Sequence, residues 1–387
     1  MINGIKTIGM IGGGQLGRMM IPSIKALGLA VAVLDPAPDA PCHAISDHHI
    51  VKGFDDADGF LELARRCDVI TYEFEHIDVN LLHMLEQAGH TIFPSVESLR
   101  VIQDKYTQKQ ALEKSGIPVP EFHAIKNLDE LTAYWDAMQQ PFMLKSRRGG
   151  YDGKGNFVVR DAGDIAAAFA QLNRGGADDL MVEPLINFTR EVSVIATRGR
   201  DGGCVIYPIA DNVHKNSILD TTTVPAALSD DISAAVVDTA QKVMECFQGI
   251  GTFCTELFVN DTTGEVYVNE VAPRVHNSGH WTIEACRTSQ FENHIRAILG
   301  LPLGAADMVV KCAVMKNIIG GPGQNGPAAY SGIESACSHP GVSVHIYGKS
   351  AVKPGRKMGH YTITGNTHDE VAGILGQTNI QPSVPID

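Results

Sequence analysis

A chain of 387 residues is too long for one ordinary hydrophobic core, so we expect two or three domains. Hydrophobic residues make up 44% of the sequence and charged residues 19%, as in a soluble globular protein, and no apolar run approaches the ~20 residues that span a bilayer. The net charge of −13 comes without a long basic stripe, which argues against a nucleic-acid binder but leaves nucleotides open as ligands.

Two features bear on where the protein works. Eight cysteines are scattered along the chain with no C-x-x-C spacing, which indicates reduced thiols in a cytoplasmic protein. The N-terminal run GIKTIGMIGGG has no basic leader and no cleavage site, and it indicates a strand and its turn, not a targeting signal. We therefore expect a cytoplasmic protein without a membrane partner.

The first hundred residues alternate between strand and helix patterns. Strands are expected at residues 5–11, 29–35, 68–73 and 90–94. One helix follows GGGQLG, and another, LLHMLEQAG, ends at Gly89. Strands that alternate with helices predict a doubly wound parallel sheet, in a first domain over residues 1–103.

Three further segments are expected along the rest of the chain. Residues 104–186 hold a helix over 104–114, strands at FMLK, NFVVR and DLMVEP, and a helix over 162–173. Residues 187–300 are strand-rich, at VSVIATRG, CVIYPIA, TFCTELFVN and EVYVNEVA, with helices over 230–247 and 282–298. Residues 301–387 hold short strands such as VSVHIYG and KMGHYTITG. The chain is thus α/β, with its parallel sheet first and its strand-rich part last.

A glycine-rich turn follows the first strand. Gly12, Gly14 and Gly17 form G-x-G-x-x-G, and Asp35 ends the next strand about 20 residues later, which is the spacing of a dinucleotide site. The same geometry serves any anionic ligand at a helix N-terminus, and it also allows close packing of strand on helix. The motif alone leaves these three possibilities open.

A second glycine-rich segment, FMLKSRRGGYDGKG, is locally basic in an acidic chain. It carries Lys145, Arg147, Arg148 and Lys154 among four glycines. Glycines let backbone N–H groups approach an anion, and the cations neutralise it, so the segment predicts a flap over a polyphosphate. A solvated basic hairpin is the alternative reading.

Two glutamates decide between these readings. Glu256 and Glu270 lie in apolar strands joined by NDTTG, and a hairpin symmetric about Thr262 would oppose Glu256 to Val268, with Glu270 as its diagonal neighbour. Two carboxylates on one face repel unless a cation lies between them, and beside a polyphosphate we expect Mg²⁺. The alternative is a pair of exposed strand glutamates.

Three other clusters carry polar chemistry. APRVHNSGHW places donors directly after Glu270, which suits an anionic reactant or a helix cap. KPGRKMGH is either a solvated turn or a second phosphate site. Glu183 and Glu191 flank a connector between two strands, and such a connector can bind the amino group of an adenine and the hydroxyls of a ribose.

Read in order, these segments resemble the ATP-grasp superfamily and, within it, the N5-carboxyaminoimidazole ribonucleotide synthetase (PurK) family. The resemblance covers nearly the whole chain through GGGQLGRM, DKYTQKQ, KSRRGGYDGKG, VEPLINFTREVSV, NVHKNSIL, TELFV, NEVAPRVHNSGHWTIEAC and KPGRKMGH. It implies an ATP-grasp fold: a Rossmann-like domain at 1–103, a lid subdomain at 104–186, a large subdomain with the metal carboxylates at 187–300, and a β-rich end at 301–387.

The resemblance also implies roles for individual residues. The residues implied to bind ATP are Lys105, Lys145, Gly150, Tyr151, Asp152, Gly153, Glu183, Pro184, Leu185, Ile186, Glu191, His214 and Lys215. Those implied to act on bicarbonate and the aminoimidazole are Arg274, His276, Asn277, Lys154, Tyr151 and Asp152. Those implied to bind the ribonucleotide are Gln15, Leu16, Glu73, Ser278, Lys353 and Arg356, and Glu256 and Glu270 would hold one or two Mg²⁺ ions.

The function implied is an ATP-dependent ligase of purine biosynthesis, expected to be a homodimer. It would convert ATP, bicarbonate and 5-aminoimidazole ribonucleotide to N5-carboxyaminoimidazole ribonucleotide through carboxyphosphate. A formate-dependent glycinamide ribonucleotide formyltransferase of the same superfamily is the nearest alternative, and PRVHNSGHW with YDGKG argues against it. An NAD-dependent dehydrogenase built on the first domain is the alternative from another class, and it leaves the two glutamates unexplained.

Overall fold

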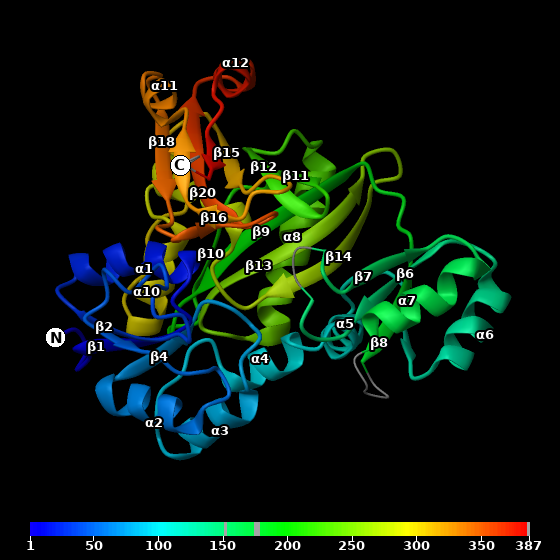
Figure 1. Ribbon diagram of the computed structural model, residues 1–387, viewed down its shortest axis with the longest axis horizontal. Coiled ribbons are helices and arrows are strands. Elements are labelled where there is room, and N and C mark those ends of the chain that lie inside the picture. The colour runs from blue at the N-terminus through cyan, green and yellow to red at the C-terminus, as the bar shows by residue number, and fades with distance from the viewer. Residues whose placement is uncertain (151–152, 174–178, 385–387) are drawn as a thin grey trace.

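A computed structural model describes residues 1–150, 153–173 and 179–384 (Figure 1). The chain forms a small parallel sheet, a small antiparallel sheet and one long antiparallel sheet that runs between them. Within the described part of the chain, no helix has both the length and the apolar character needed to cross a membrane. The eight cysteines are all free, and four of them are buried, as the sequence predicts.

The first sheet confirms the predicted doubly wound arrangement. Its four parallel strands lie in the order β3 (His48–Ile50), β2 (Ala30–Leu34), β1 (Thr7–Ile11) and β4 (Val69–Tyr72). One face packs on α1 (Gln15–Ala26) and α10 (Gln290–Leu299), and the other on α2 (Ala57–Arg66), α3 (Val79–Gln87) and α4 (Val96–Ile102). Helix α10 therefore returns from the distant part of the chain to cover the first sheet.

The predicted strand at residues 90–94 is wrong. These residues are all described, and they hold only a single bridge between Ile92 and Ile70. Pro94 lacks the N–H that a strand ladder needs, and Ser95 caps α4 by accepting a hydrogen bond from Ser98 N at 3.2 Å. The chain therefore turns into a helix where the apolar pattern predicted a longer strand.

The second sheet is antiparallel, and the basic glycine-rich loop leaves it. Its order is β5 (His123–Ile125), β8 (Leu180–Pro184), β6 (Phe142–Ser146) and β7 (Asn156–Val159). It packs on α6 (Leu128–Met138) and α7 (Ile165–Leu172), and a 3₁₀ turn at Ala162–Asp164 precedes α7, which confirms the expected helix there. The loop joins β6 to β7, at the side of this sheet nearest the rest of the molecule.

The long sheet combines the middle and the end of the chain. Its strands are β14 (Glu265–Ala272), β13 (Gly251–Asn260), β9 (Arg190–Arg198), β11 (Ala210–Lys215), β12 (Ile218–Val224), β15 (Cys312–Ile319), β20 (Lys357–Gly365) and β18 (Val342–Ile346), with β10 (Cys204–Ile206) beside β9. Helix α8 (Asp230–Phe247), as predicted, and α5 (Lys105–Lys114) pack on one face of β9, β13 and β14. The opposite face packs an apolar core that includes Ile195, Cys254 and Trp281, and it carries the polar side chains Glu191, His214 and Glu256 toward the cavity.

The end of the chain adds small elements around β15, β18 and β20. These elements are β16 (Gly326–Pro327), β17 (Ala329–Ser331), α11 (Ile333–Cys337), β19 (Ala351–Val352), α12 (His368–Gln377) and β21 (Gln381–Ser383). They enclose their own apolar core, which includes Tyr361, Ile363 and Val371. This part, where the family resemblance implies a β-rich end, also contains the helices α11 and α12.

Two local predictions are corrected by the structure. The expected helix over 282–298 is split into α9 (Thr282–Ala285) and α10, because Cys286 is extended and Ser289 caps α10 by accepting from Glu292 N at 3.1 Å. In the β13–β14 hairpin, Glu256 pairs directly with Glu270, and Leu257 pairs with Val268. The hairpin is centred between Thr262 and Thr263, not on Thr262, and a bulge at Asn269 adds one more residue. Each difference moves the partner of Glu256 by one residue, and together they turn the predicted diagonal pair into a facing pair.

Candidate active site

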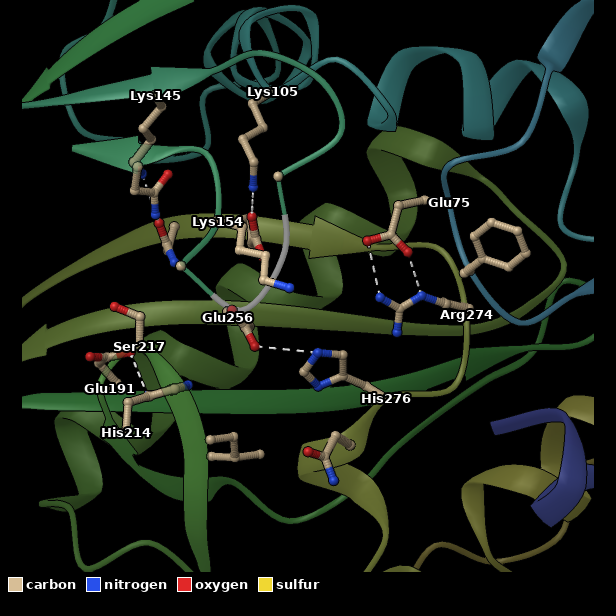
Figure 2. Close-up of a pocket in the computed structure, with 18 of the residues that line it drawn as sticks. Glu75, Lys105, Lys145, Lys154, Glu191, His214, Ser217, Glu256, Arg274 and His276 are labelled. Atoms are coloured by element: carbon tan, nitrogen blue, oxygen red, sulfur yellow. Dashed lines mark hydrogen bonds and ion pairs between the residues drawn. The ribbon is translucent and has the colours of Figure 1, made fainter. Parts of the chain in front are cut away.

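One large cavity lies where the three sheets meet. Its volume is about 650 Å³, and its walls come from the loops after β1 and β4, the β6–β7 loop, and the polar face of the long sheet (Figure 2). Most of the predicted site residues described by the structure line it: Gln15, Leu16, Glu73, Lys105, Lys145, Gly150, Gly153, Lys154, Glu191, His214, Glu256, Glu270, Arg274, His276 and Asn277.

Other predicted residues lie away from this cavity. Among the described residues, those that do not line it are Glu183, Pro184, Leu185, Ile186, Lys215, Ser278, Lys353 and Arg356. Ser278 is fully buried, Lys215 pairs with Asp220 at 2.9 Å, and Arg356 donates to the backbone oxygen of Ala351 at 2.7 Å. Tyr151 and Asp152 lie outside the described residues.

The carboxylate pair faces the cavity from neighbouring strands. Glu270 contacts Lys105, and a Glu256 oxygen lies 3.4 Å from His276 Nε2. Burial raises the pKa of Glu256, and the nearby Glu191 adds to this effect. Burial and the neighbouring Lys145 lower the pKa of Lys105 to about 8. Two hard carboxylates that share one buried wall fit a divalent cation, and Lys105 supplies positive charge at the same place.

The side chain of Glu183 lies in a buried cluster of charges. Its carboxylate lies 2.7 Å from Lys145 Nζ and 3.0 Å from Lys109 Nζ, and all three side chains are buried. Burial acts to raise the pKa of Glu183, but the two ammonium groups lower it below its ordinary value. The carboxylate therefore holds Lys145 in place, and an adenine would have to meet the backbone of this segment.

An arginine–glutamate pair connects the first domain to the long sheet. Arg274 Nε and Nη2 lie 2.5 and 3.0 Å from the two oxygens of Glu75, a bidentate arrangement. Burial acts to raise the pKa of Glu75, but Arg274 lowers it to about 2. Glu75 was not predicted, although its position in the loop after β4, at the carboxyl edge of a parallel sheet, is the signal that could have found it.

The structure explains the G-x-G-x-x-G turn. The Glu73 carboxylate accepts hydrogen bonds from Gly14 N and, at 2.6 Å, from Gly17 N, so it occupies the N-terminus of α1. Asp35 accepts from Gly13 N at 2.8 Å. The position where a dinucleotide pyrophosphate would bind is thus filled by the protein's own carboxylate, which removes the structural basis of the dehydrogenase alternative.

Several cavity residues were not predicted. They are Phe74, Glu75, His76, Met143, Asn156, Phe188, Ser217, Leu219, Phe258 and Asn269. Lys357, from the KPGRKMGH cluster that was expected to be a turn or a second phosphate site, also lines the cavity. Phe188 and Phe258 are stacked at 4.6 Å, and Glu191 lies 3.0 Å from His214 Nδ1. Burial acts to lower the pKa of His214, but Glu191 raises it above its ordinary value. Aromatic faces beside a carboxylate–histidine pair suit a nucleoside at this end of the cavity.

A parallel first sheet, a small sheet with a basic loop, and a long sheet with paired carboxylates enclose one cavity and define an ATP-grasp enzyme. Residues 5–103, 110–291 and 313–373 match the ribonucleotide synthetase preATP-grasp domain, the ATP-grasp domain and the phosphoribosylaminoimidazole carboxylase C-terminal domain. The chain is 39% identical over 364 residues to the N5-carboxyaminoimidazole ribonucleotide synthase of Bacillus subtilis, covering 94% of this chain and 92% of that protein. The chain belongs to the N5-carboxyaminoimidazole ribonucleotide synthase (PurK) family.

Two further relatives agree with this assignment. The chloroplastic phosphoribosylaminoimidazole carboxylase of Vigna aconitifolia is 42% identical over 372 residues; the match covers 95% of this chain but only 66% of the plant protein. The N5-carboxyaminoimidazole synthase of Aspergillus clavatus, solved in complex with ADP and 5-aminoimidazole ribonucleotide, superposes with a TM-score of 0.87 at 36% identity over 97% of each chain. The expected family, fold and ATP-grasp ligase class are confirmed.

Proposed function

We propose that this protein is the ATP-dependent ligase that carboxylates the exocyclic amine of 5-aminoimidazole ribonucleotide with bicarbonate in purine biosynthesis. The observation that carries this proposal is the single cavity, in which Gln15 and Glu73 of the first domain share a space with Lys105, Lys145 and the carboxylate pair. Together with family membership, this geometry supports one site for two reactants. The expected domain boundaries, cytoplasmic location and homodimer remain part of the proposal; an assembly of twice 41.6 kDa in sedimentation analysis would support the dimer.

The reaction proceeds in two balanced steps. A bicarbonate oxygen attacks the γ-phosphorus of ATP, the bond to ADP breaks, and carboxyphosphate forms. The amine nitrogen then attacks the carboxyl carbon, either of carboxyphosphate itself or of the CO₂ released from it. Phosphate leaves, and the amine loses a proton. Both steps crowd anions, which buried cations stabilise.

The chain's own residues meet these needs in separate parts of the cavity. Lys105 and Lys145 neutralise the phosphates, and Arg274, held flat by Glu75, presents its remaining N–H groups to the carboxyphosphate. The β6–β7 loop, with Gly150, Gly153 and Lys154, covers the reactants and excludes water from the mixed anhydride. Glu191 and His214 hold the ribose of ATP.

Magnesium fits the donor set of the facing Glu256 and Glu270. When bound there, the metal would neutralise phosphate charge. Removal of divalent cations by a chelator should therefore stop turnover.

The ribonucleotide end of the cavity lies beside the first domain. Gln15 and Glu73 line the cavity, and Lys357 joins them where we had expected Lys353 and Arg356. Burial raises the pKa of Glu73, and Asp35 adds to this effect, whereas its hydrogen bonds from Gly17 and Gly14 act to lower it. The proposed contacts of Lys353 and Arg356 with the substrate phosphate therefore depend on the family resemblance.

The decisive experiment measures ADP release with bicarbonate, with and without 5-aminoimidazole ribonucleotide. We expect release to depend on both substrates and the carboxylated ribonucleotide to form in equal amount. Release with formate and glycinamide ribonucleotide instead would support the formyltransferase alternative. Nicotinamide oxidation or reduction would support the dehydrogenase.

A further inference from the structure

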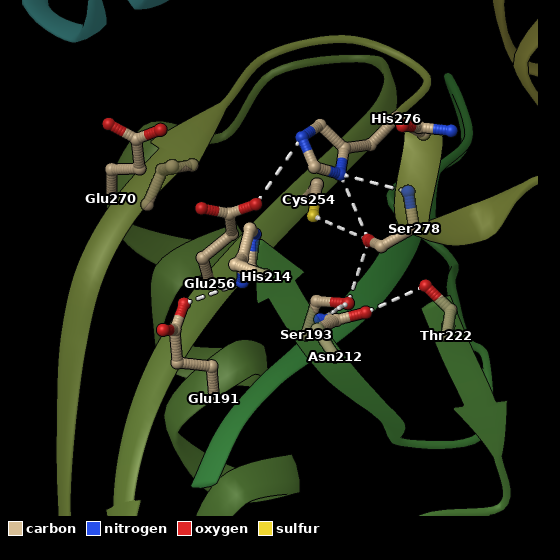
Figure 3. Close-up of polar contacts among 12 residues, drawn as sticks. Glu191, Ser193, Asn212, His214, Thr222, Cys254, Glu256, Glu270, His276 and Ser278 are labelled. Atoms are coloured by element: carbon tan, nitrogen blue, oxygen red, sulfur yellow. Dashed lines mark hydrogen bonds and ion pairs between the residues drawn. The ribbon is translucent and has the colours of Figure 1, made fainter. Parts of the chain in front are cut away.

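A buried chain of polar side chains runs from the interior of the long sheet to His276 (Figure 3). Thr222 Oγ1 donates to Asn212 Oδ1 at 2.9 Å, and Asn212 Nδ2 donates to Ser193 Oγ at 2.9 Å. Ser193 Oγ donates to Ser278 Oγ at 2.7 Å, and Ser278 Oγ lies 2.9 Å from His276 Nδ1. We name Asn212, Ser193 and Ser278 the relay.

The relay is inaccessible to the reactants. Ser193 and Ser278 are fully buried and Asn212 is 7% exposed, and none of the three lines the cavity. Polar groups buried this deeply must satisfy one another, because an unpaired one costs about 1–3 kcal/mol. The relay is therefore a defined set of hydrogen bonds. The direction in which each bond donates bears on which nitrogen of the His276 imidazole carries the proton.

The backbone sets the direction at His276. Ser278 N–H donates to His276 Nδ1 at 3.3 Å, as part of the cap of the short 3₁₀ turn at Asn277–Gly279. A backbone N–H cannot accept, so Nδ1 must carry its lone pair. The Ser278 hydroxyl accepts from Ser193 and lies 2.9 Å from the same nitrogen, to which it can donate, while the weaker Cys254 thiol lies 3.7 Å away. This conclusion does not depend on how the Asn212 amide is turned.

With Nδ1 as acceptor, the neutral ring carries its proton on Nε2. That nitrogen lies 3.4 Å from Glu256 Oε1, and His276 lines the cavity. The cavity therefore meets an N–H donor at this position and no basic lone pair. Such a donor suits the oxygen of an anionic reactant, whereas a general base needs a free lone pair to take a proton.

We propose that the relay holds His276 as the Nε2–H tautomer, so that His276 donates a hydrogen bond to the reactant carboxylate and does not take the proton from the amine. His276 is then a catalytic residue, and Ser278, Ser193 and Asn212 are positioning residues. The reactant named here rests on the proposed function, whereas the tautomer depends only on the protein.

The first test reads the tautomer directly. Protein labelled with [¹⁵N]histidine and free of nucleotide and metal is studied by long-range ¹H–¹⁵N correlation, and His276 is assigned by the signals lost in His276→Gln. We expect a protonated Nε2 and an unprotonated Nδ1. A proton on Nδ1, or on both nitrogens, would overturn the proposal, whatever substrate the enzyme uses. An enzyme with the expected tautomer but without the expected ADP release would refute the proposed function alone.

The second test separates a donor from a base. Glutamine keeps an N–H near the position of Nε2, but it cannot take a proton at neutral pH. We expect His276→Gln to retain kcat within about tenfold and His276→Ala to lose about a hundredfold. A His276→Gln enzyme as inactive as His276→Ala would identify His276 as a base and would contradict the proposal.

The third test addresses the relay itself. Ser278→Ala should lower kcat several-fold with little change in the KM for ATP and weaken the tautomer preference, and Ser278→Cys, which keeps a donor, should restore part of both. Ser98 is the matched control, because it is also buried, at 4% exposed, but donates to Phe247 O, outside the relay. If Ser278→Ala and Ser98→Ala changed stability alike and neither changed kcat or the tautomer, the relay would have no positioning role.

Discussion

Three of the cations expected to meet a phosphate or carboxylate already have a carboxylate partner inside the protein. Lys105 contacts Glu270, Lys145 lies 2.7 Å from Glu183, and Arg274 forms a bidentate pair with Glu75. Buried charges without such partners would cost several kcal/mol each. The pairs keep the cations charged and oriented before the reactants arrive, and a bound metal would replace Lys105 as the partner of Glu270.

Glu270→Gln tests the carboxylate pair. Loss of one charge should weaken the metal site and reduce turnover by about a hundredfold, because a charged hydrogen bond is worth about 1.5–3 kcal/mol. Steady-state ADP release over a magnesium titration measures this. Glu265→Gln is the control, because Glu265 begins the same strand but is exposed. Wild-type activity of a folded Glu270→Gln enzyme at ordinary magnesium would contradict the assignment.

Glu75→Gln tests the Arg274 pair through stability. The variant leaves a buried guanidinium without its anion and should lower the free energy of unfolding by about 3 kcal/mol. Glu62→Gln breaks the exposed pair with Arg66, at 2.9 Å, and should cost no more than about 0.5 kcal/mol. Urea denaturation compares the two variants. Equal losses in the free energy of unfolding would show that the Glu75–Arg274 pair stabilises the protein no more than an exposed pair does.

At the scale of elements, the β6–β7 loop approaches the turn between β11 and β12. A methyl group at Gly153 would lie 2.3 Å from Ser217 Cβ. Gly153 also has φ +74°, where a side chain is strained. The base of the loop is anchored, because Arg147 forms a bidentate pair with Asp104, at 3.0 and 2.7 Å. A loop anchored at its base and in close contact near its tip is suited to cover the cavity.

Gly153→Ala should therefore raise the KM for ATP by about tenfold. Gly149→Ala has a similar φ of +74° but, among the described residues, no atom within 4 Å, so it reports the backbone strain alone, about 1–2 kcal/mol. Ser217→Gly should partly rescue Gly153→Ala, since the next atom would then be Ser217 Cα at 3.7 Å. Equal KM values for the two alanine variants would argue against contact between the loop and the turn.

At the scale of the molecule, His294 joins two sheets. It lies on α10, where Nε2 is 2.8 Å from Thr71 Oγ1 of β4 and Nδ1 accepts from Thr252 N of β13 at 3.1 Å. Burial lowers the pKa of His294 to about 4. The contact between the first domain and the long sheet thus depends on a neutral histidine.

This arrangement predicts acid sensitivity. The pKa of His294 in the folded protein, about 4, lies below its value of about 6.5 in the unfolded chain. Between these pH values the unfolded state binds a proton that the folded state does not, so stability falls as pH falls, by about 1.4 kcal/mol per pH unit for this group. Urea denaturation at pH 7 and pH 5 should show a shallower loss in His294→Gln, and an unchanged loss in His123→Gln, whose side chain is exposed. If all three proteins lost the same stability, His294 would not be the sensor.

Local patterns predicted the elements well, and their errors have local causes. The predicted strands β1, β2 and β4 and the predicted helix α8 are confirmed. Their apolar patterns were visible in the sequence because these segments bury one face or both. The predicted helix over 282–298 failed because the extended Cys286 ends one helix and Ser289 caps the next. The facing of Glu256 and Glu270 was missed for two reasons: the turn is centred between Thr262 and Thr263, and a symmetric hairpin does not include the bulge at Asn269.

The sequence alone determined the element order, the family and most of the cavity residues, because these depend on periodicity and on motifs that are short along the chain. Only the tertiary structure decided three other matters. Glu73 fills the helix N-terminus that the glycine motif left open, Glu183 holds two lysines, and Glu75 pairs with Arg274 across 199 residues. Each of these three contacts joins polar or charged groups in a buried, weakly screened space. Which groups meet there is set by the packing of residues that are distant in the sequence.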